Sequence, residues 1–189
     1  ALLDDLKNKK ARAASLEAIL KNHSNFYAGV KSVLQEADRL GGIVGAVSEK
    51  LSFDPHYQTA LEIALGASSQ HIIVEDEGAA TRAIDFLKKN RSGRATFLPL
   101  TTIKARQLPE QNQSRIEASP GFLGLASELV TYEADLDNIF QNLLGTTAIF
   151  DTIEHARAAA RQVRYQVRIV TLDGTELRTG GSYAGGANR

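Results

Sequence analysis

Gly42-Ile43-Val44-Gly45 and Gly121-Phe122-Leu123-Gly124 are apolar segments of the same form, 79 residues apart, and they decide the predicted fold. The pair Leu65-Gly66 is repeated as Leu144-Gly145 at the same offset. Longer matches occur further along at offsets of 76 and then 72 residues: 72–75 with 148–151, 79–87 with 155–163, and 95–100 with 167–172. Landmarks that recur in order at nearly constant spacing indicate two copies of one structural unit.

Each copy has the pattern strand, helix, short β-rich run, helix, strand. This pattern predicts a mixed α/β (α+β) fold rather than an all-β sandwich. We expect two lobes related by a pseudo-twofold axis, residues 23–100 and residues 120–189. Residues 101–119 are polar and contain Pro109, so they are predicted to be a connector with little core. Duplicated sheets have similar edges, which favours edge-to-edge pairing with a second copy of the chain.

Composition narrows the class of protein. The chain has 189 residues, of which 43% are hydrophobic and 23% charged, enough to bury a core. Lys plus Arg and Asp plus Glu number 22 each, so no overall charge attracts nucleic acid or an anionic membrane. The absence of cysteine fits a reducing compartment, the cytoplasm, and no apolar run approaches the roughly 18 residues of a membrane span. A start at Ala1 without any methionine favours a fragment of a longer protein.

Residues 1–22 predict a helix with a coiled-coil seam. Six positions in steps of four and three residues form the seam, and five of them are apolar: Leu2, Leu6, Lys9, Ala13, Leu16 and Leu20. Three heptads are the minimum for a coil, so an amphipathic helix packed on its own domain is the alternative. The position at one end of the chain favours the root of a coiled-coil arm.

The motifs of common catalytic sites are absent from the sequence. It contains neither a phosphate-binding Gly-x4-Gly-Lys-Ser/Thr loop nor a Gly-x-Ser-x-Gly elbow. Acidic residues 75–77 fall where a strand gives way to a helix, a place where carboxylates stabilise the helix dipole. The four histidines are far apart and lack metal-binding spacing: His23, His56, His71 and His155. We therefore predict no catalytic residue, metal or cofactor, and a small-molecule α/β enzyme would need a ligand in a cleft between the lobes.

The C-terminal tail holds two glycine pairs, Gly180-Gly181 and Gly185-Gly186, on either side of Tyr183. Glycine permits close approach of another backbone, and a strand with so little side chain gains little from packing on its own lobe. We interpret the tail as a strand that docks against a second subunit. A flexible linker or chain end is the alternative.

Basic residues cluster in both copies. Lys88, Lys89, Arg91 and Arg94 lie close together in the first copy, and Arg157, Arg161 and Arg164 have helical spacing in the second. Either cluster could contact phosphates weakly, without base specificity and with steep salt dependence. Basic residues at a helix C-terminus also favour its dipole, so solvated surface is the alternative.

The chain resembles the hinge domain of bacterial structural maintenance of chromosomes (SMC) proteins from Phe26 to Gly186. In the first copy the resemblance rests on residues 26–31, 41–47, 64–67, 70–71 and 93–100. In the second copy it rests on residues 122–124, 126–130, 142–146 and 168–174, with the two glycine pairs. The family commonly has Met-Thr between those pairs, where this chain has Tyr183-Ala184.

The resemblance implies a closed, ring-like homodimer that joins two long antiparallel coiled-coil arms. The ATPase heads, with their ATP and Mg, would lie at the far ends of the arms and outside this chain, which is itself not an enzyme. Residues 1–22 would pair with the return helix of the same arm. The resemblance places Gly180, Gly181, Gly185 and Gly186 in the dimer interface, and Tyr183 lies between them.

The resemblance also implies DNA binding near the coil junction, with Lys88, Lys89 and Arg189 as candidates. The wider role would be chromosome condensation and segregation at the nucleoid, in the cytoplasm and away from membranes. In the alternative interpretation, DNA binding is the primary function and dimerisation is secondary.

Overall fold

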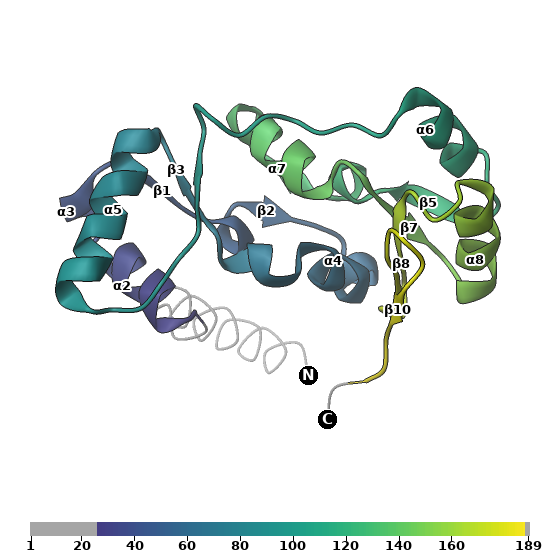
Figure 1. Cartoon of the computed structure of the whole chain (residues 1–189), viewed down its shortest axis with the longest axis horizontal. Helices are drawn as coiled ribbons and strands as arrows, with labels where there is room; N and C mark the ends of the chain where they lie inside the picture. Colours follow the sequence, from purple (N-terminus) through teal and green to yellow (C-terminus); the bar gives the residue numbers. More distant parts are fainter. Residues whose placement is uncertain (1–25, 188–189) are drawn as a thin grey trace, which may run out of the picture. The chain divides into compact units, whose positions relative to one another are not determined.

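The computed structural model describes residues 26–187 (Figure 1). The predicted coil at residues 1–22 and the candidate Arg189 therefore lie outside the described residues. Two compact units are present, the first formed by residues 26–49 and 70–101 and the second by residues 50–69 and 102–187. This division differs from the predicted lobes, because residues 50–69 group with the second unit.

The first unit is a three-stranded sheet with helices packed on it. Its elements are α2 (Ala28–Gln35), α3 (Ala37–Leu40), β1 (Ile43–Ala46), β3 (Ile72–Val74), α5 (Glu77–Asn90) and β4 (Phe97–Pro99). The sheet order is β1-β3-β4, with β1 antiparallel and β4 parallel to the central strand. The uninterrupted apolar run of β3 is wholly buried, as expected for a central strand. Asp76 caps α5 by accepting a hydrogen bond from the Ala79 amide at 2.8 Å, so the acidic segment there has a structural role.

The second unit is built on a five-stranded sheet of order β10-β9-β8-β7-β5. Its strands are β5 (Phe122–Leu125), β7 (Thr147–Phe150), β8 (Arg168–Thr171), β9 (Glu176–Leu177) and β10 (Tyr183–Ala184), and a separate pair is formed by β2 (Leu51–Ser52) and β6 (Thr131–Tyr132). Its α-helices are α4 (Gln58–Leu65), α6 (Glu110–Glu117), α7 (Asp137–Leu144) and α8 (Ile153–Gln162). Phe140 and Phe150 are fully buried in this unit.

The predicted repeat is visible in strand order and in hydrogen bonds. Strands β5-β7-β8 have the same antiparallel and parallel pairing as β1-β3-β4, and a register shift occurs at the same place in both. The Glu75 amide donates to the Gly42 carbonyl at 2.8 Å, and the Asp151 amide donates to the Gly121 carbonyl at 3.0 Å. These correspondences support a duplication of the chain.

The β2–β6 pair adds a sign of twofold symmetry. The two strands run antiparallel, and Ser52 lies opposite Thr131, which is 79 residues further along the chain. An antiparallel pair of equivalent residues has a local twofold axis between its strands. This pairing also explains why residues 50–69 belong with the second unit, since β2 joins that unit through β6.

The predicted connector contributes more to the core than its composition indicated. Residues 101–119 contain α6, and the side chains of Leu108 and Ile116 belong to the second unit's apolar core. Ile116 is fully buried. Polar composition concealed this helix, because two apolar side chains are enough to attach it to the sheet.

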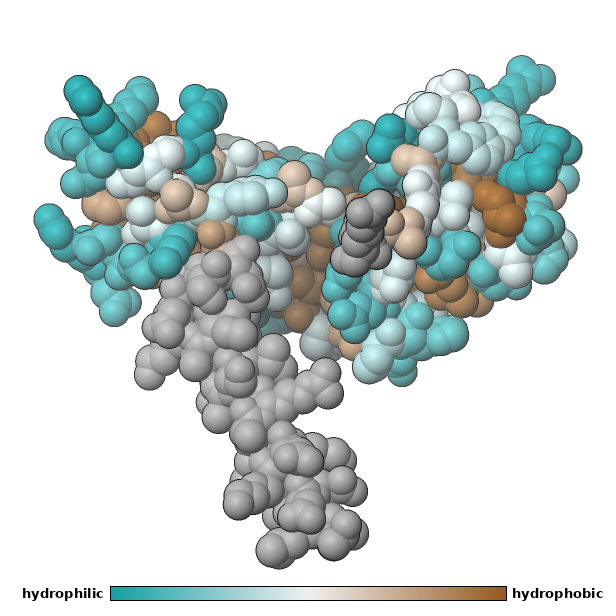
Figure 2. Space-filling model, turned by 90° about the horizontal axis from the view of Figure 1, so that it is seen from below, coloured by the Kyte–Doolittle hydropathy of each residue, from teal (hydrophilic) through white to brown (hydrophobic). Residues whose placement is uncertain are grey.

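Apolar side chains are dispersed on the surface. The face shown in Figure 2 is mainly hydrophilic, with small separate apolar patches. Among the described residues, the exposed large apolar side chains are Tyr27, Ile63, Ile84 and Tyr183. Within residues 26–187, no helix is both long and apolar enough to cross a bilayer.

Candidate docking hairpin

The glycine-rich tail forms a hairpin at one edge of the second unit's sheet. Strand β10 pairs antiparallel with β9, with Tyr183 opposite Leu177 and Ala184 opposite Glu176. Gly180 and Gly181 form the turn between the strands, with φ of +91° and +104°, a region that favours glycine. A Cβ at either glycine would meet no atom within 4 Å, so within the chain these glycines serve backbone conformation rather than close packing.

The outer side of β10 is an open sheet edge, because β10 is the terminal strand in the sheet order. The Arg178 amide donates to the Ser182 carbonyl at 2.8 Å. Backbone groups alternate in direction along an antiparallel strand, so the amide and carbonyl of the next residue, Tyr183, face away from β9. The hairpin thus presents Tyr183 backbone groups to an incoming strand.

Tyr183 is held from one face of the hairpin by Tyr165, which lies just after α8 in the chain. Their hydroxyl groups share a hydrogen bond of 2.7 Å, and their ring centroids are 6.2 Å apart. This hydrogen bond is the main reason that the pKa of Tyr183 is raised, while the charges of Arg157 and Arg161 act in the opposite direction. The Gly180 amide also donates to the Tyr165 carbonyl at 2.9 Å. Tyr165 therefore anchors both the turn and the second strand.

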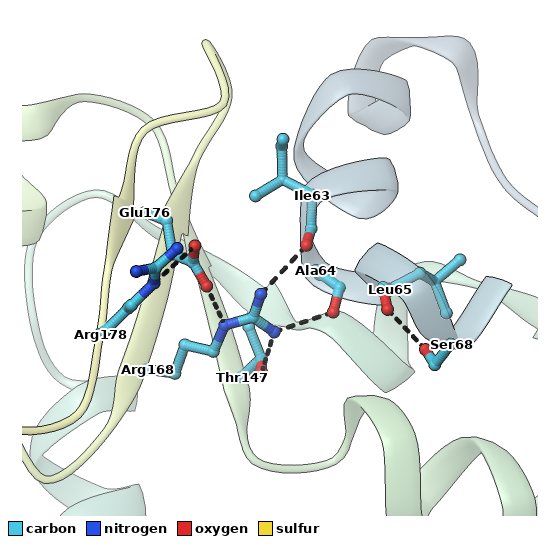
Figure 3. A network of polar contacts seen from close by, with 8 residues as sticks. All are labelled: Ile63, Ala64, Leu65, Ser68, Thr147, Arg168, Glu176 and Arg178. Carbon is cyan, nitrogen blue, oxygen red and sulfur yellow. Dashed lines mark hydrogen bonds and ion pairs between the residues drawn. The ribbon is translucent and has the colours of Figure 1, made fainter. Parts of the chain in front are cut away.

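A polar network lies on the hairpin's other side (Figure 3). The Arg168 guanidinium on β8 donates through Nε to Glu176 Oε2 at 2.6 Å and through Nη1 and Nη2 to the carbonyls of Ala64 and Ile63, at 2.8 and 3.0 Å. Those carbonyls lie in the last turn of α4, where intrahelical donors run out. Arg178 donates to the second carboxylate oxygen of Glu176 at 3.1 Å. One carboxylate thereby connects β9 to β8 and, through Arg168, to α4.

Two opposing influences act on the Glu176 carboxyl. Burial by itself would raise its pKa, since a charge is less stable away from water. The hydrogen bonds and charges of Arg168 and Arg178 outweigh burial, so the pKa of Glu176 lies below its ordinary value. The side chain of Glu176 is 12% exposed and that of Arg168 is 27% exposed, so solvent screens this pair less than a surface pair.

A hollow of about 590 Å³ lies beside the hairpin, within the second unit. Helix α4, the β8–β9 turn, β9 and the tail line it, through Thr59, Ile63, Asp173, Gly174, Glu176, Arg178 and residues 184–187. The lining mixes two carboxylates, an arginine and small apolar groups. Among residues 26–187, no three His, Asp or Glu side chains are grouped so as to hold a metal ion.

The basic candidates lie in the first unit and not in the hairpin. Lys88 and Lys89 are in the last turn of α5, and Arg91 and Arg94 are in the next loop, all exposed. Lys89 forms an ion pair of 2.9 Å with Asp85, which raises its pKa by hydrogen bonding. In the second unit, Arg157, Arg161 and Arg164 are exposed on and just after α8.

The sequence predicted the glycines and Tyr183 as interface residues, which stays a prediction, and it did not single out their neighbours Tyr165, Arg168 and Glu176. One signal was available for Arg168 and Glu176. Arg168 stands in an otherwise apolar strand, and Glu176 comes after it across a turn containing Gly174. An arginine and a glutamate on the same face of neighbouring strands can form a cross-strand ion pair, and here the pair is diagonal, since Val170 lies opposite Glu176.

Comparison with known proteins agrees with this architecture. The sequence model of the SMC proteins flexible hinge domain matches residues 40–160. The chain is 44% identical, over 97% of its length, to the chromosome partition protein Smc of Lactiplantibacillus plantarum, of which it covers 16%.

Two solved hinge domains have the same fold. A Geobacillus stearothermophilus SMC hinge domain, crystallised as an asymmetric dimer, matches with a TM-score of 0.91 and 43% identity, over 97% of this chain and 75% of that one. The Pyrococcus furiosus Smc hinge domain with an extended coiled coil matches with a TM-score of 0.72 and 30% identity, over 96% of this chain and 65% of that one.

Sequence and fold together define one class of protein, the α/β hinge domains of chromosome partition proteins. The chain belongs to the SMC hinge family, as its motifs predicted. The match is to a hinge domain and not to an ATPase head. The chain spans about a sixth of the length of the matched full-length relative.

Proposed function

We propose that this domain is a homodimerisation hinge that joins the two coiled-coil arms of a chromosome condensation and segregation ATPase. The named relatives support the chromosomal role, and the related hinge that was crystallised as a dimer supports self-association. The relative with an extended coiled coil supports an arm that begins at residues 1–22. The ATP-binding heads belong to parts of the longer protein outside this chain, and the site of action is the nucleoid in the cytoplasm.

The open edge of β10 is the observation that carries this proposal. A terminal strand with unpaired backbone groups is a template for pairing with another chain. The glycines on either side keep bulky side chains away from the approaching backbone. Because the exposed apolar side chains of the described residues are few, main-chain pairing accounts for docking better than a large apolar face does.

Tyr183→Pro tests the edge directly. Proline removes the outward-facing amide of residue 183 without removing a hydrogen bond to β9, since edge positions tolerate proline. Sedimentation velocity of the purified chain should show a dimer for the wild type and a monomer for Tyr183→Pro.

Tyr183→Val is the matched control. Both variants lose the bond between the Tyr165 and Tyr183 hydroxyls, but only the proline variant loses the amide, so Tyr183→Val should remain dimeric. Unfolding by circular dichroism would show that both variants are folded. A folded Tyr183→Pro variant that dimerises like Tyr183→Val would contradict docking through this edge.

We also propose weak, sequence-nonspecific DNA binding by the basic cluster of the first unit. Lys88, Arg91 and Arg94 are exposed and form no ion pair with an acidic side chain of residues 26–187, whereas Lys89 pairs with Asp85. The backbone of Arg94 packs against Gly29 at the start of α2, so the cluster lies near the point where the preceding helix would enter. Phosphate contacts of this kind neutralise backbone charge and carry no base information.

Charge reversal separates this role from dimerisation. Lys88→Glu with Arg91→Glu should reduce the affinity for a DNA duplex by at least about tenfold at low salt. The reason is that each lost phosphate contact removes part of the counterion release that drives nonspecific binding. Fluorescence anisotropy would measure the affinity, and sedimentation should show an unchanged dimer. Wild-type protein that binds no DNA at low salt would exclude the role, and DNA binding with a monomeric wild type would favour DNA binding as the primary function.

A further inference from the structure

The docking hairpin is short for an element that must hold one conformation. The β9–β10 ladder consists of two residue pairs. A two-stranded hairpin is marginally stable in water unless other contacts support it. The orientation of β10 therefore depends on side chains that tie the hairpin to the rest of the second unit.

Side-chain contacts attach the hairpin to the second unit from both of its faces. Successive strand residues point to opposite faces, so Leu177 and Tyr183 share one face while Glu176 and Ala184 share the other. Leu177 is fully buried in the apolar core on the first face, where Tyr183 meets Tyr165. On the other face, the Glu176 carboxylate is the group that fixes β9.

Arg168 gives this carboxylate a rigid attachment. Its guanidinium contacts the carbonyls of Ile63 and Ala64 and, at 3.4 Å, the hydroxyl of Thr147 on β7 (Figure 3). An arginine held by several acceptors loses little further freedom when it binds a carboxylate. Charge-assisted hydrogen bonds of this type are among the stronger polar contacts in proteins.

We propose that Glu176, held by Arg168, is a positioning residue that keeps the β9–β10 hairpin in the conformation that docks a second copy of the chain, so that acid weakens the dimer. This inference rests on the proposed function of the hairpin. When only a fraction of molecules has the competent conformation and both copies of a dimer must have it, the apparent dissociation constant rises by the inverse square of that fraction.

The charged groups around Glu176 determine the direction of the pH effect. Arg168 on β8 and Arg178 just after β9 donate to the carboxylate, and Asp173 lies in the β8–β9 turn of the same hollow. Glu62 on α4 accepts a hydrogen bond from Gln58. Together the arginines hold the pKa of Glu176 below its ordinary value. The contribution to docking is therefore complete above the pKa of an unfolded-chain glutamate and is lost as the pH falls through the lowered pKa.

Glu176→Gln tests the inference, because glutamine keeps the shape and removes the charge. At neutral pH, sedimentation should show a dimer dissociation constant about tenfold above the wild-type value, as expected if about a third of the hairpins remain competent. As the pH falls below about 4.5, the ordinary pKa of glutamate, the wild-type dimer should weaken, whereas the dissociation constant of Glu176→Gln should change less. A purely structural role would produce no such difference in the pH profile.

Two control variants sharpen the result. Asp173→Asn removes the other carboxylate of the hollow and should keep most of the wild-type acid response. Arg178→Gln should weaken the dimer less than Glu176→Gln, because Glu176 keeps its shorter bond to Arg168. If Glu176→Gln does not fold, Arg168→Lys replaces it as the test. Lysine keeps the positive charge but lacks the planar guanidinium with its several donors, so the dimer should weaken by an intermediate amount.

A folded Glu176→Gln variant with the wild-type dissociation constant and the wild-type pH profile would overturn the inference. A wild type that is monomeric at neutral pH would instead contradict the proposed function of the hairpin. In that event, hydrogen exchange of the amides in residues 176–184 still decides whether Glu176 positions the hairpin. Faster exchange in Glu176→Gln supports the positioning role, and unchanged exchange overturns it.

Discussion

The two units share a three-stranded core and differ in the strands added beyond it. In the first unit the sheet stops at β4, whereas in the second the corresponding strand β8 continues into β9 and β10. The matching hydrogen bonds at Gly42 and Gly121 show how closely the cores correspond. The same three-stranded core therefore remains a small body in one unit and supports the added β9–β10 hairpin in the other. The proposed function lies where the copies differ.

A second difference concerns the helices outside the cores. Both α4 and α7 belong to the second unit, although they occupy corresponding places in the two copies. Only α4 is transferred from the first copy, which gives the second unit more elements, and the large side chains of Phe140 and Phe150 are fully buried in that unit. We expect the second unit to be the more stable of the two, since apolar burial is the main stabilising term in folding.

Truncating the matched core residues of β7 and β3 should have the largest effect. Phe150 and Val74 are both fully buried in the apolar clusters of their units, and Phe150 also packs edge to face on Phe122 at 5.8 Å. Phe150→Ala should lower the free energy of unfolding by about 3–5 kcal/mol, and Val74→Ala by about 1–3 kcal/mol. Urea titration followed by circular dichroism measures both.

Amide hydrogen exchange of the two variants would then show which unit each substitution destabilises. If the units unfold separately, Phe150→Ala should accelerate exchange in α8 but not in α5, and Val74→Ala should do the reverse. An exposed substitution, Thr81→Ala, serves as the control for each titration. A larger loss for Val74→Ala than for Phe150→Ala would contradict the expected order of the two effects. Wild-type amides that exchange more slowly in α5 than in α8 would contradict the expected order of stability of the units.

The matched turn glycines should have the smaller effect. Gly42 and Gly121 have φ of +73° and +85°, so alanine at either costs about 1–2 kcal/mol for the backbone alone. A Cβ at Gly42 would lie 2.7 Å from the Ala79 Cβ, and a Cβ at Gly121 would also displace the hydrogen bond between the Asp151 and His155 side chains. Thermal unfolding should therefore show a greater loss for Gly121→Ala than for Gly42→Ala.

A compensating change separates contact from backbone strain at this turn. Adding Ala79→Gly to Gly42→Ala removes the close contact between the Cβ atoms but leaves the unfavourable φ. Glycine within α5 itself costs up to about 1 kcal/mol, which the single variant Ala79→Gly measures. After that correction, partial recovery is expected. Absence of any recovery would assign the whole loss to the backbone.

Local patterns predicted much of the fold. The glycine-bounded apolar runs became β1 and β5, and the acidic segment before α5 provides its cap. Polar composition hid α6, because a helix attached by Leu108 and Ile116 has a weak apolar pattern. The glycine pairs marked the tail as a predicted strand, and the structure forms it into a hairpin. The contacts of Tyr183 with Tyr165 and of Arg168 with α4 join segments that a single sequence does not pair.

The order of motifs along the chain was sufficient to determine the family and to predict the repeat, because both depend on residue types at set spacings. Local chemistry likewise determined where the turns fall, since glycine and the helix-capping side chains act within a few residues. Only the tertiary structure decided that residues 50–69, which belong to the first copy in sequence, pack in the second unit. It also decided that Arg168 connects α4 to the β9–β10 hairpin. The physical reason is that such contacts depend on which buried surfaces and acceptors meet after the chain has folded, and distance along the sequence does not encode that choice.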